Sequence, residues 1–321
     1  MKQTVVMALG GNALTRADQA GTFEEQRANA ASMARGIRGV LAASRGVVLV
    51  HGNGPQVGAL SLQQEEGAAL APPQPLFALG AMTQGHIGSL LTLALHDACS
   101  PRTPRIAAVV THVLVDRADP AFEHPTKPIG PFFERGRALA LASSRGWTVR
   151  EDAGRGYRRV VASPEPLGIL EADAIRTLVD AGFVVVAAGG GGVPVCQDAD
   201  HGPPAGVEAV IDKDLAAARL ATSLKADTLV LVTGVDHVAL DFGTSREQQV
   251  EAMTMGEAEG HLRDGQFAPG SMGPKVTAAV RFLRAGGKLA VVTSPQHVRG
   301  ALEGRHGTRV LPARAAVDVA R

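Results

Sequence analysis

The densest group of reactive side chains in the sequence is Asp212-Lys213-Asp214, which places two carboxylates and an ammonium at consecutive positions. An apolar pair precedes this group, and an Ala/Leu-rich run with helical periodicity follows it. Asp212 is therefore predicted to cap a helix whose first turn holds Lys213 and Asp214. Because a helix N-terminus attracts anions, a bound anion would explain a lysine that otherwise opposes the helix dipole. The alternative is an ordinary capped helix with a surface lysine.

The distribution of lysine in the chain favours a bound anion over an ordinary capped helix. The chain has 32 Lys and Arg residues, and only six of them are Lys. Three of the six, Lys127, Lys213 and Lys275, lie in loops rich in Gly, Pro or Asp. Lysine is a compact charge on a flexible stem, whereas arginine is a rigid planar fork. The three lysines therefore suggest a site for a phosphoryl group whose charge shifts during transfer.

Two loops that combine glycine with asparagine follow two predicted strands. The carboxyl ends of parallel strands meet at one edge of a sheet, where ligands bind. Glycine lets the backbone approach a ligand and direct its N–H groups at it. A shared anion site is favoured over two plain tight turns, although neither loop has Walker or Rossmann spacing. The residues concerned are Gly10, Gly11, Asn12, Gly52, Asn53 and Gly54.

The composition narrows the class of protein. A hydrophobic content of 45% and a charged content of 20% are typical of a globular domain. With a net charge of +1 and 3% aromatic residues, neither a nucleic acid nor a membrane is expected as a partner, and no apolar run approaches the roughly 20 residues of a membrane span. The two cysteines, Cys99 and Cys196, indicate a reducing, cytoplasmic location. No His/Cys cluster has the spacing of a metal site.

These loops must be held by the elements around them. Strands and helices alternate, which predicts an α/β fold with a mainly parallel sheet between helices. Four consecutive glycines, 189–192, follow one strand and suggest either phosphate contact or simple flexibility. Strands are expected at 4–9, 47–50, 105–116, 157–161, 183–188, 227–233, 288–293 and 310–311, with 310–311 closing an edge. Helices are expected at 23–44, 55–66, 78–98, 171–181 and 276–285.

The segment 118–166 differs from the rest of the chain. It is rich in proline and charge, and its apolar runs are short. We expect residues 1–321 to form a single domain, with 118–166 inserted as a small protruding subdomain of loops and short strands. A segment of this length without structure is unusual unless it is functional.

The motifs together resemble those of carbamate kinases, a branch of the amino acid kinase family. The resemblance runs through nearly the whole chain, and the segment Pro-Thr-Lys-Pro-Ile-Gly is distinctive of carbamate kinases. The matching stretches are ALGGNAL (8–14), HGNGPQVG (51–58), AMTQG (81–85), DPAF (119–122), PTKPIGP (125–131), YRRVV (157–161), 189–194, 206–216 and 270–275.

The resemblance implies a three-layer α/β/α fold and a homodimer. It implies reversible transfer of phosphate between ATP and carbamate with Mg²⁺, so that carbamoyl phosphate and ADP give ATP, in arginine or other carbamoyl-compound catabolism. Lys127, Lys213 and Lys275 would contact phosphate, and Asp214 would organise the lysines. The two Gly/Asn loops would hold carbamate and the transferred phosphoryl group, and segment 118–166 would act as a lid carrying Lys127.

The nucleotide would lie near Lys213, Asp236, Met272 and Lys275, according to the same resemblance. One departure is Ala239, which stands where similar sequences carry a tyrosine near the nucleotide base. Two alternatives remain open at this point: a related kinase acting on another small carboxylate-like substrate, and a nucleotide-binding regulator without catalytic activity.

Overall fold

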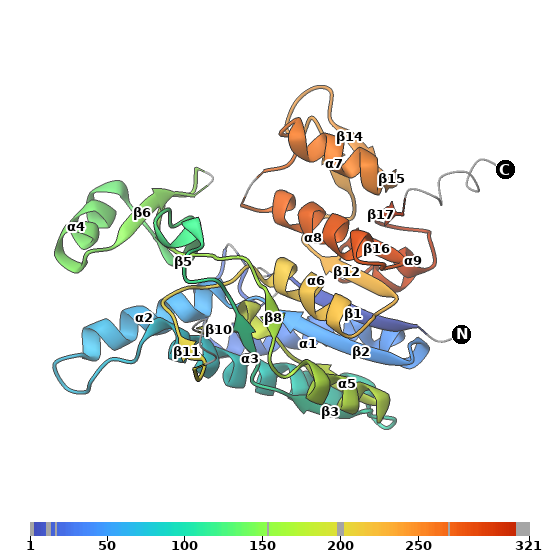
Figure 1. Ribbon diagram of the computed structural model, residues 1–321, viewed down its shortest axis with the longest axis horizontal. Helices are drawn as coiled ribbons and strands as arrows, with labels where there is room; N and C mark the ends of the chain where they lie inside the picture. Colours follow the sequence, from blue (N-terminus) through green and yellow to red (C-terminus); the bar gives the residue numbers. More distant parts are fainter. Residues whose placement is uncertain are drawn as a thin grey trace.

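A sheet of eight strands forms the centre of the molecule (Figure 1). The computed structural model describes residues 3–10, 14–16, 18–152, 154–197, 202–268 and 270–312. The strand order is β15-β17-β16-β12-β1-β2-β9-β3, and neighbouring strands are parallel except β16 and β17. The strands are β1 (Thr4–Leu9), β2 (Gly46–His51), β3 (Arg105–Ala108), β9 (Phe183–Val186), β12 (Thr228–Val232), β15 (Ala252–Thr254), β16 (Leu289–Thr293) and β17 (Thr308–Leu311).

Helices cover both faces of this sheet. Apolar residues of α1, α3 and α9 pack on one face, and those of α5, α6, α7 and α8 pack on the other. The helices are α1 (Phe23–Ala43), α2 (Gly54–Gly67), α3 (Leu76–Cys99), α4 (Arg135–Arg145), α5 (Ala172–Asp180), α6 (Lys213–Ser223), α7 (Met255–Arg263), α8 (Met272–Arg284) and α9 (Val298–Leu302).

Strand β1 shows why the central strands are apolar throughout. Val6 and Ala8 join the core on one face of the sheet, whereas Val5, Met7 and Leu9 join the core on the other. Successive side chains of a strand point to opposite faces, so a strand covered on both sides must be apolar at every position. The predicted α/β fold, with three layers and a mainly parallel sheet, is confirmed.

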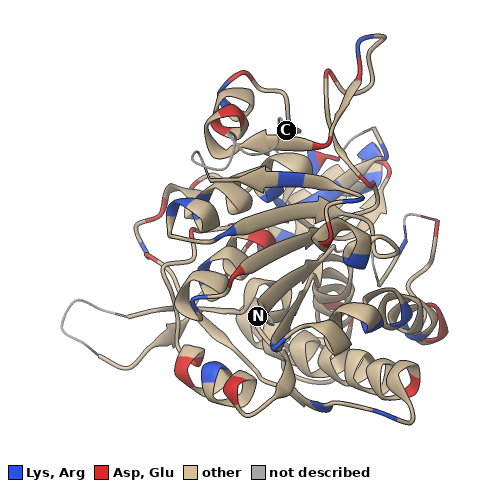
Figure 2. Cartoon of the chain, turned by 90° about the vertical axis from the view of Figure 1, so that its right-hand side faces the viewer, with Lys and Arg blue, Asp and Glu red and all other residues tan. Residues whose placement is uncertain are grey.

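A smaller antiparallel sheet projects from the body of the molecule, together with α4 (Figure 1). It lies within the segment expected to protrude, but the expectation of loops and short strands missed the 11-residue helix α4. Charged residues of both signs are interspersed over the helices and loops (Figure 2). The strands of the projecting sheet are β5 (Lys127–Phe133), β7 (Tyr157–Val161) and β6 (Thr148–Glu151); outside it lie β4 (His112–Leu114), β8 (Gly168–Ile169), β10 (Val193–Cys196), β11 (Ala205–Gly206), β13 (Val238–Leu240) and β14 (Gln248–Val250).

Two predicted strands are wrong in their extent or place. The single strand expected at 105–116 is divided between β3 in the central sheet and β4 in a second sheet. The chain leaves the central sheet because Thr111 bonds to Gln84 of α3 through both its N–H and its carbonyl. The strand expected at the edge, 310–311, belongs to β17, which lies between β15 and β16.

Helix α3 is long and apolar enough to cross a membrane, by length and composition only, and it is the one such helix in the part of the chain described. The sequence pattern had indicated no run of that length. The helix packs against the central sheet beside α1, with Leu90, Leu91 and Leu95 buried. Core helices of globular domains meet the same length and composition criteria.

The four glycines at 189–192 form a packed junction. A Cβ atom at Gly189 would lie 2.1 Å from the ring of His51, and one at Gly190 would lie 2.2 Å from the Asn53 amide. A Cβ at Gly191 would lie 2.3 Å from the carbonyl oxygen of Ile211. Gly190, Gly191 and Gly192 also have positive φ angles, between 66° and 91°. Close approach therefore explains the glycines better than flexibility does.

We expect Gly191→Ala to lower the free energy of unfolding by roughly 2–4 kcal/mol, since it combines a backbone clash with a strained φ. Gly243→Ala is the matched control, because Gly243 also has a positive φ, 76°, but has open space around it. That variant should lose only about 1 kcal/mol. Urea unfolding measures the loss in free energy of unfolding for both variants. Equal losses would contradict the conclusion that close packing requires glycine at position 191.

Candidate active site

A buried carboxylate joins two lysines at the start of α6 and α8. Asp214, 2% exposed, lies in the first turn of α6. Its Oδ2 atom accepts hydrogen bonds from Lys213 Nζ at 3.0 Å and from Lys275 Nζ at 2.8 Å. Lys275 belongs to the first turn of α8. Two sequence segments that are 61 residues apart thereby place their ammonium groups on one oxygen atom.

Asp212 brings in the third lysine. Its Oδ1 caps α6 by accepting from the N–H groups of Asp214 and Leu215, as the sequence predicted. Its Oδ2 accepts from Lys127 Nζ at 2.5 Å. Lys127 is the first residue of β5, in the projecting sheet. The three lysines singled out in the sequence are thus gathered around two carboxylates, and Asp212 is a member of the cluster beyond its capping role.

The cluster carries an excess of positive charge. Three ammonium groups face two carboxylates, at a helix N-terminus whose dipole adds further positive potential. Burial tends to raise the pKa of Asp212, but Lys127 and Lys213 outweigh it and hold that pKa well below its usual value. Asp212 therefore acts as a fixed negative charge, and the excess of ammonium groups over carboxylates favours an anionic ligand.

The two lysines on Asp214 differ in their acidity. Burial lowers the pKa of Lys213, but the Asp214 and Asp212 carboxylates more than offset it, and the pKa lies above its ordinary value. Burial also lowers the pKa of Lys275, and there the attraction of Asp214 does not compensate, because Lys213 repels the second ammonium. The pKa of Lys275 lies below its ordinary value.

The two Gly/Asn loops begin at the ends of neighbouring strands. β1 and β2 are parallel neighbours, with Leu9 opposite His51, and the Gly52 N–H donates to the carbonyl of Leu9 at 3.2 Å. A Cβ atom at Gly10 would lie 2.9 Å from the Val232 carbonyl oxygen, so a side chain there would collide with β12. Gly11 and Asn12 lie outside the described residues.

The second loop also meets the projecting sheet. A Cβ atom at Gly54 would lie 3.5 Å from the carbonyl oxygen of Pro128, the residue that follows Lys127. The structure therefore places the loop Gly52-Asn53-Gly54 beside the strand that carries Lys127. The loop and the lysine cluster therefore lie near each other at the carboxyl ends of the central strands.

Asn53 has a defined orientation. The amide is buried, and its Nδ2 donates to Thr83 Oγ1 at 2.9 Å. The Thr83 hydroxyl itself donates to the carbonyl of Gly80 at 2.7 Å, so it can only accept from Asn53. Within the part of the chain that the structure describes, the Asn53 Oδ1 atom has no hydrogen bond and can accept one. Thr83 lies within a matching motif, but nothing in the sequence pattern indicated this role.

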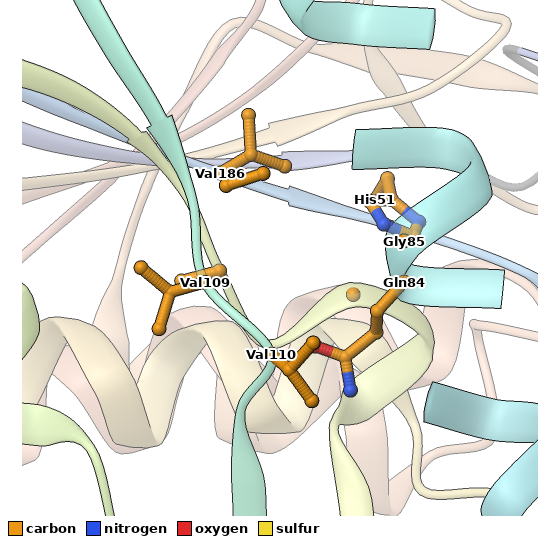
Figure 3. A pocket seen from close by; sticks show the side chains of 9 residues that line it. His51, Gln84, Gly85, Val109, Val110 and Val186 are labelled. Atoms are coloured by element: carbon orange, nitrogen blue, oxygen red, sulfur yellow. The ribbon is translucent and has the colours of Figure 1, made fainter. Parts of the chain in front are cut away.

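His51 lies on the other side of the loop, against a small pocket (Figure 3). α3 contributes Gln84 and Gly85 to this pocket, and the segment after β3 contributes Val109 and Val110. Burial lowers the pKa of His51 to about 4, opposed by its bond to the Gly52 carbonyl. The imidazole is therefore neutral at physiological pH.

The two remaining predicted nucleotide residues lie farther along the same edge. Asp236 follows β12, and its carboxylate pairs with His297 Nδ1 at 2.7 Å rather than with a lysine. A bond from Ser294 and the pair with His297 lower the pKa of Asp236. Met272 is the first residue of α8 and packs against the core. The sequence did not single out His297.

We expect Asp214→Asn to lower the free energy of unfolding by about 3–5 kcal/mol at pH 7, because two buried ammonium groups lose their counter-charge. The pKa of Lys275, already depressed, should fall further. The unfolded chain then holds more protons than the folded chain above that pKa, so stability should rise with pH and the deficit should shrink.

Urea unfolding at pH 7 and pH 9.5 tests this. Asp173→Asn is the control, since Asp173 pairs with Arg176 but its side chain is 91% exposed, and it should change stability by at most about 1 kcal/mol. A deficit of the same size at both pH values would show that the lysines are not the cause.

Comparison with known proteins agrees with this geometry. The model of the amino acid kinase family matches residues 3–294. The carbamate kinase of Pyrococcus horikoshii is 46% identical over 316 residues, which cover 97% of this chain and 100% of that protein. Two structures of Giardia lamblia carbamate kinase, one bound to citric acid and one bound to AMP-PNP, are each 41% identical and cover 97% of this chain and 99% of theirs, with TM-scores of 0.92 and 0.87. The chain therefore belongs to the amino acid kinase family.

Proposed function

We propose that the protein is a carbamate kinase, which transfers a phosphoryl group reversibly between ATP and carbamate. The observation that carries the proposal is the cluster of Lys127, Lys213 and Lys275 beside the loop Gly52-Asn53-Gly54. The names of the relatives support it, since carbamate kinases match this chain over nearly its whole length.

Phosphoryl transfer requires in-line positioning and neutralisation of the charge on the moving oxygen atoms. The three lysines supply the neutralising charge, and Asp214 and Asp212 hold them in place before the substrate arrives. Backbone N–H groups of the Gly/Asn loops would bind the oxygens of carbamate and phosphate. Carbamate is already a nucleophile, so the site needs no strong base, which is consistent with His51, whose pKa of about 4 makes it a weak base.

The Asn53 amide supports carbamate as the substrate. Thr83 fixes this amide so that Oδ1 remains available as an acceptor. A planar group that bears both oxygen and NH₂ can donate to that atom, and carbamate is such a group. A methyl group in the same place would leave the buried acceptor without a partner.

The nucleotide and a Mg²⁺ ion would bind to the site together. The AMP-PNP complex of the Giardia relative supports ATP and ADP as the nucleotides. The resemblance of the motifs implies Lys213, Asp236, Met272 and Lys275 as the residues beside the nucleotide. Asp212 and Asp214 are occupied by lysines, and the described residues contain no group of three or more His, Cys, Asp or Glu suited to a metal. The residues thus fit a Mg²⁺ ion held mainly by phosphate oxygens, which would neutralise phosphate charge when bound.

We expect carbamoyl phosphate with MgADP to yield ATP, and acetyl phosphate to be a poorer donor. Loss of the hydrogen bond to a buried acceptor costs about 1–3 kcal/mol, or roughly 5–150-fold in kcat/KM. ATP formation by the purified protein, with each donor at equal concentration, measures the ratio. Thr83→Val should lower the ratio of kcat/KM with carbamoyl phosphate to kcat/KM with acetyl phosphate, because Asn53 loses the hydrogen bond that orients its amide.

Equal rates with the two donors would contradict the Asn53 argument. Absence of ATP from carbamoyl phosphate, in a folded protein that binds ADP, would rule out carbamate kinase activity. A different small acyl phosphate that then gave ATP would identify a related kinase. No turnover with any donor would identify a nucleotide-binding regulator.

A homodimer is proposed from the outer face of α3. Met82, Gly85, Ser89 and Leu93 recur on this face at helical spacing, and all four are exposed. Val110, also exposed, lines the small pocket together with Gly85 (Figure 3). An apolar helix face with small residues at its centre is suited to close packing against a second copy.

Leu93→Arg is expected to shift the protein from dimer to monomer, because Leu93 is 66% exposed at this face and arginine would bury an unpaired charge. Leu70→Arg is the control, since Leu70 is 95% exposed on the loop after α2. Sedimentation velocity at micromolar concentration measures the mass. A monomeric native protein, or a dimeric Leu93→Arg variant, would contradict the proposed interface.

The setting of the reaction is also a proposal. We place the protein in the cytoplasm, supported by a sequence with only two cysteines. A role in arginine or other carbamoyl-compound catabolism follows from the reaction, which can make ATP from carbamoyl phosphate.

A further inference from the structure

Two motifs that mark the sequence contain glycines that lie against each other. Gly58 closes the motif 51–58 on α2, and Gly130 lies in the motif 125–131 on β5. A Cβ atom at Gly58 would lie 1.9 Å from the backbone nitrogen of Gly130 and 2.2 Å from its Cα. Gly130 has a φ of 73°, and the pairing of β5 with β7 shifts register just after it. Both positions therefore require glycine, and β5 presses its backbone directly onto α2.

The same face of α2 holds the projecting sheet by polar contacts. Ser61 and Glu65 follow Gly58 at intervals of three and four residues, so the three lie on one side of the helix. Arg159 of β7 donates to Ser61 Oγ at 2.9 Å and to Glu65 Oε1 at 3.0 Å. Trp147 Nε1 donates to the same Glu65 oxygen at 3.2 Å. We call Gly58, Ser61 and Glu65 the α2 seat.

The α2 seat contacts β5 close to Lys127. Lys127 stands three residues before Gly130 in β5, and Ile129 between them is buried with Val57 of α2. Nearer the start of α2, Gly54 meets the carbonyl of Pro128. β5 therefore lies against α2 at two points, and the helix that begins at the Gly/Asn loop also fixes the strand that begins at Lys127.

We propose that Gly58 and Gly130 position Lys127 for phosphoryl transfer, with Glu65 as the polar anchor of the same seat. The inference rests on the proposed function, because it assigns Lys127 to the phosphoryl group. Neither glycine touches the reacting atoms. Each acts through the distance between Lys127 and the loop Gly52-Asn53-Gly54, which α2 keeps constant.

The test is a double-mutant cycle between Gly58→Ala and Lys127→Ala. An added Cβ must push β5 away from α2 by roughly 1.5 Å to reach van der Waals distance. A displacement of that size should lower kcat roughly 10²-fold. In the Lys127→Ala background, Gly58→Ala should change kcat by no more than about twofold, because the group that it misplaces is already absent. If the double variant lost kcat by the product of the two single losses, the proposal would be overturned.

Trp147 gives a readout that does not depend on activity. It is the single tryptophan of the chain and lines a small cavity with Gly58 and Gly130. Gly58→Ala should shift its fluorescence emission to the red and raise its quenching by acrylamide. Gly67→Ala, at the other end of α2 in open space, should leave emission and kcat unchanged. If Gly58→Ala left the emission and the quenching of Trp147 unchanged, the contact between Gly58 and Gly130 would be contradicted.

Glu65→Gln provides a second variant if Gly58→Ala does not fold. It keeps a hydrogen-bond acceptor but removes the charge that pairs with Arg145 and Arg159. It should shift the Trp147 emission and lower kcat, and this loss should disappear in the Lys127→Ala background. Inactivity of the native protein with every acyl phosphate would refute the proposed function, whereas the Trp147 signal would still decide whether the seat exists.

Discussion

The carboxylate of Asp214 is the charge on which the site depends. It is almost fully buried, and one of its oxygen atoms holds the ammonium groups of two lysines from different helices. A buried ion pair of this kind contributes little net stability, since removing the charges from water costs about as much as their attraction returns. The contribution of Asp214 is to fix the positions of the two ammonium groups. Without Asp214, Lys213 and Lys275 would repel each other, and Lys275 would lose the carboxylate that raises its pKa.

The sequence predicted the parts of the structure that depend on local pattern. The cap at Asp212 was predicted because a capping residue follows an apolar pair and precedes a helical run. The central strands were predicted because burial on both faces requires unbroken apolar runs. The break between β3 and β4 was missed, since both halves are apolar and the cause is a bond to Gln84 on a distant helix.

Most features of the site that could not be predicted from the sequence depend on contacts between distant segments. The pair of Lys127 with Asp212 joins residues that are 85 positions apart, so Asp212 was assigned only its capping role. The four glycines at 189–192 had two equal explanations until His51, Asn53 and Ile211 were found against them. Asn53 needed Thr83 to define its orientation. A sequence pattern indicates which residues are unusual, but not which of them meet.

The order of the site residues along the chain has a consequence for biosynthesis. The loop Gly52-Asn53-Gly54 leaves the ribosome early, and Lys275 leaves after more than two hundred further residues. Until Lys275 and β16 have emerged, Asp214 holds only one lysine, and the central sheet lacks the strands beyond β12. The cluster of three lysines therefore assembles only after most of the chain has been synthesised, and an anion that needs all three lysines can stabilise only a chain that extends past Lys275.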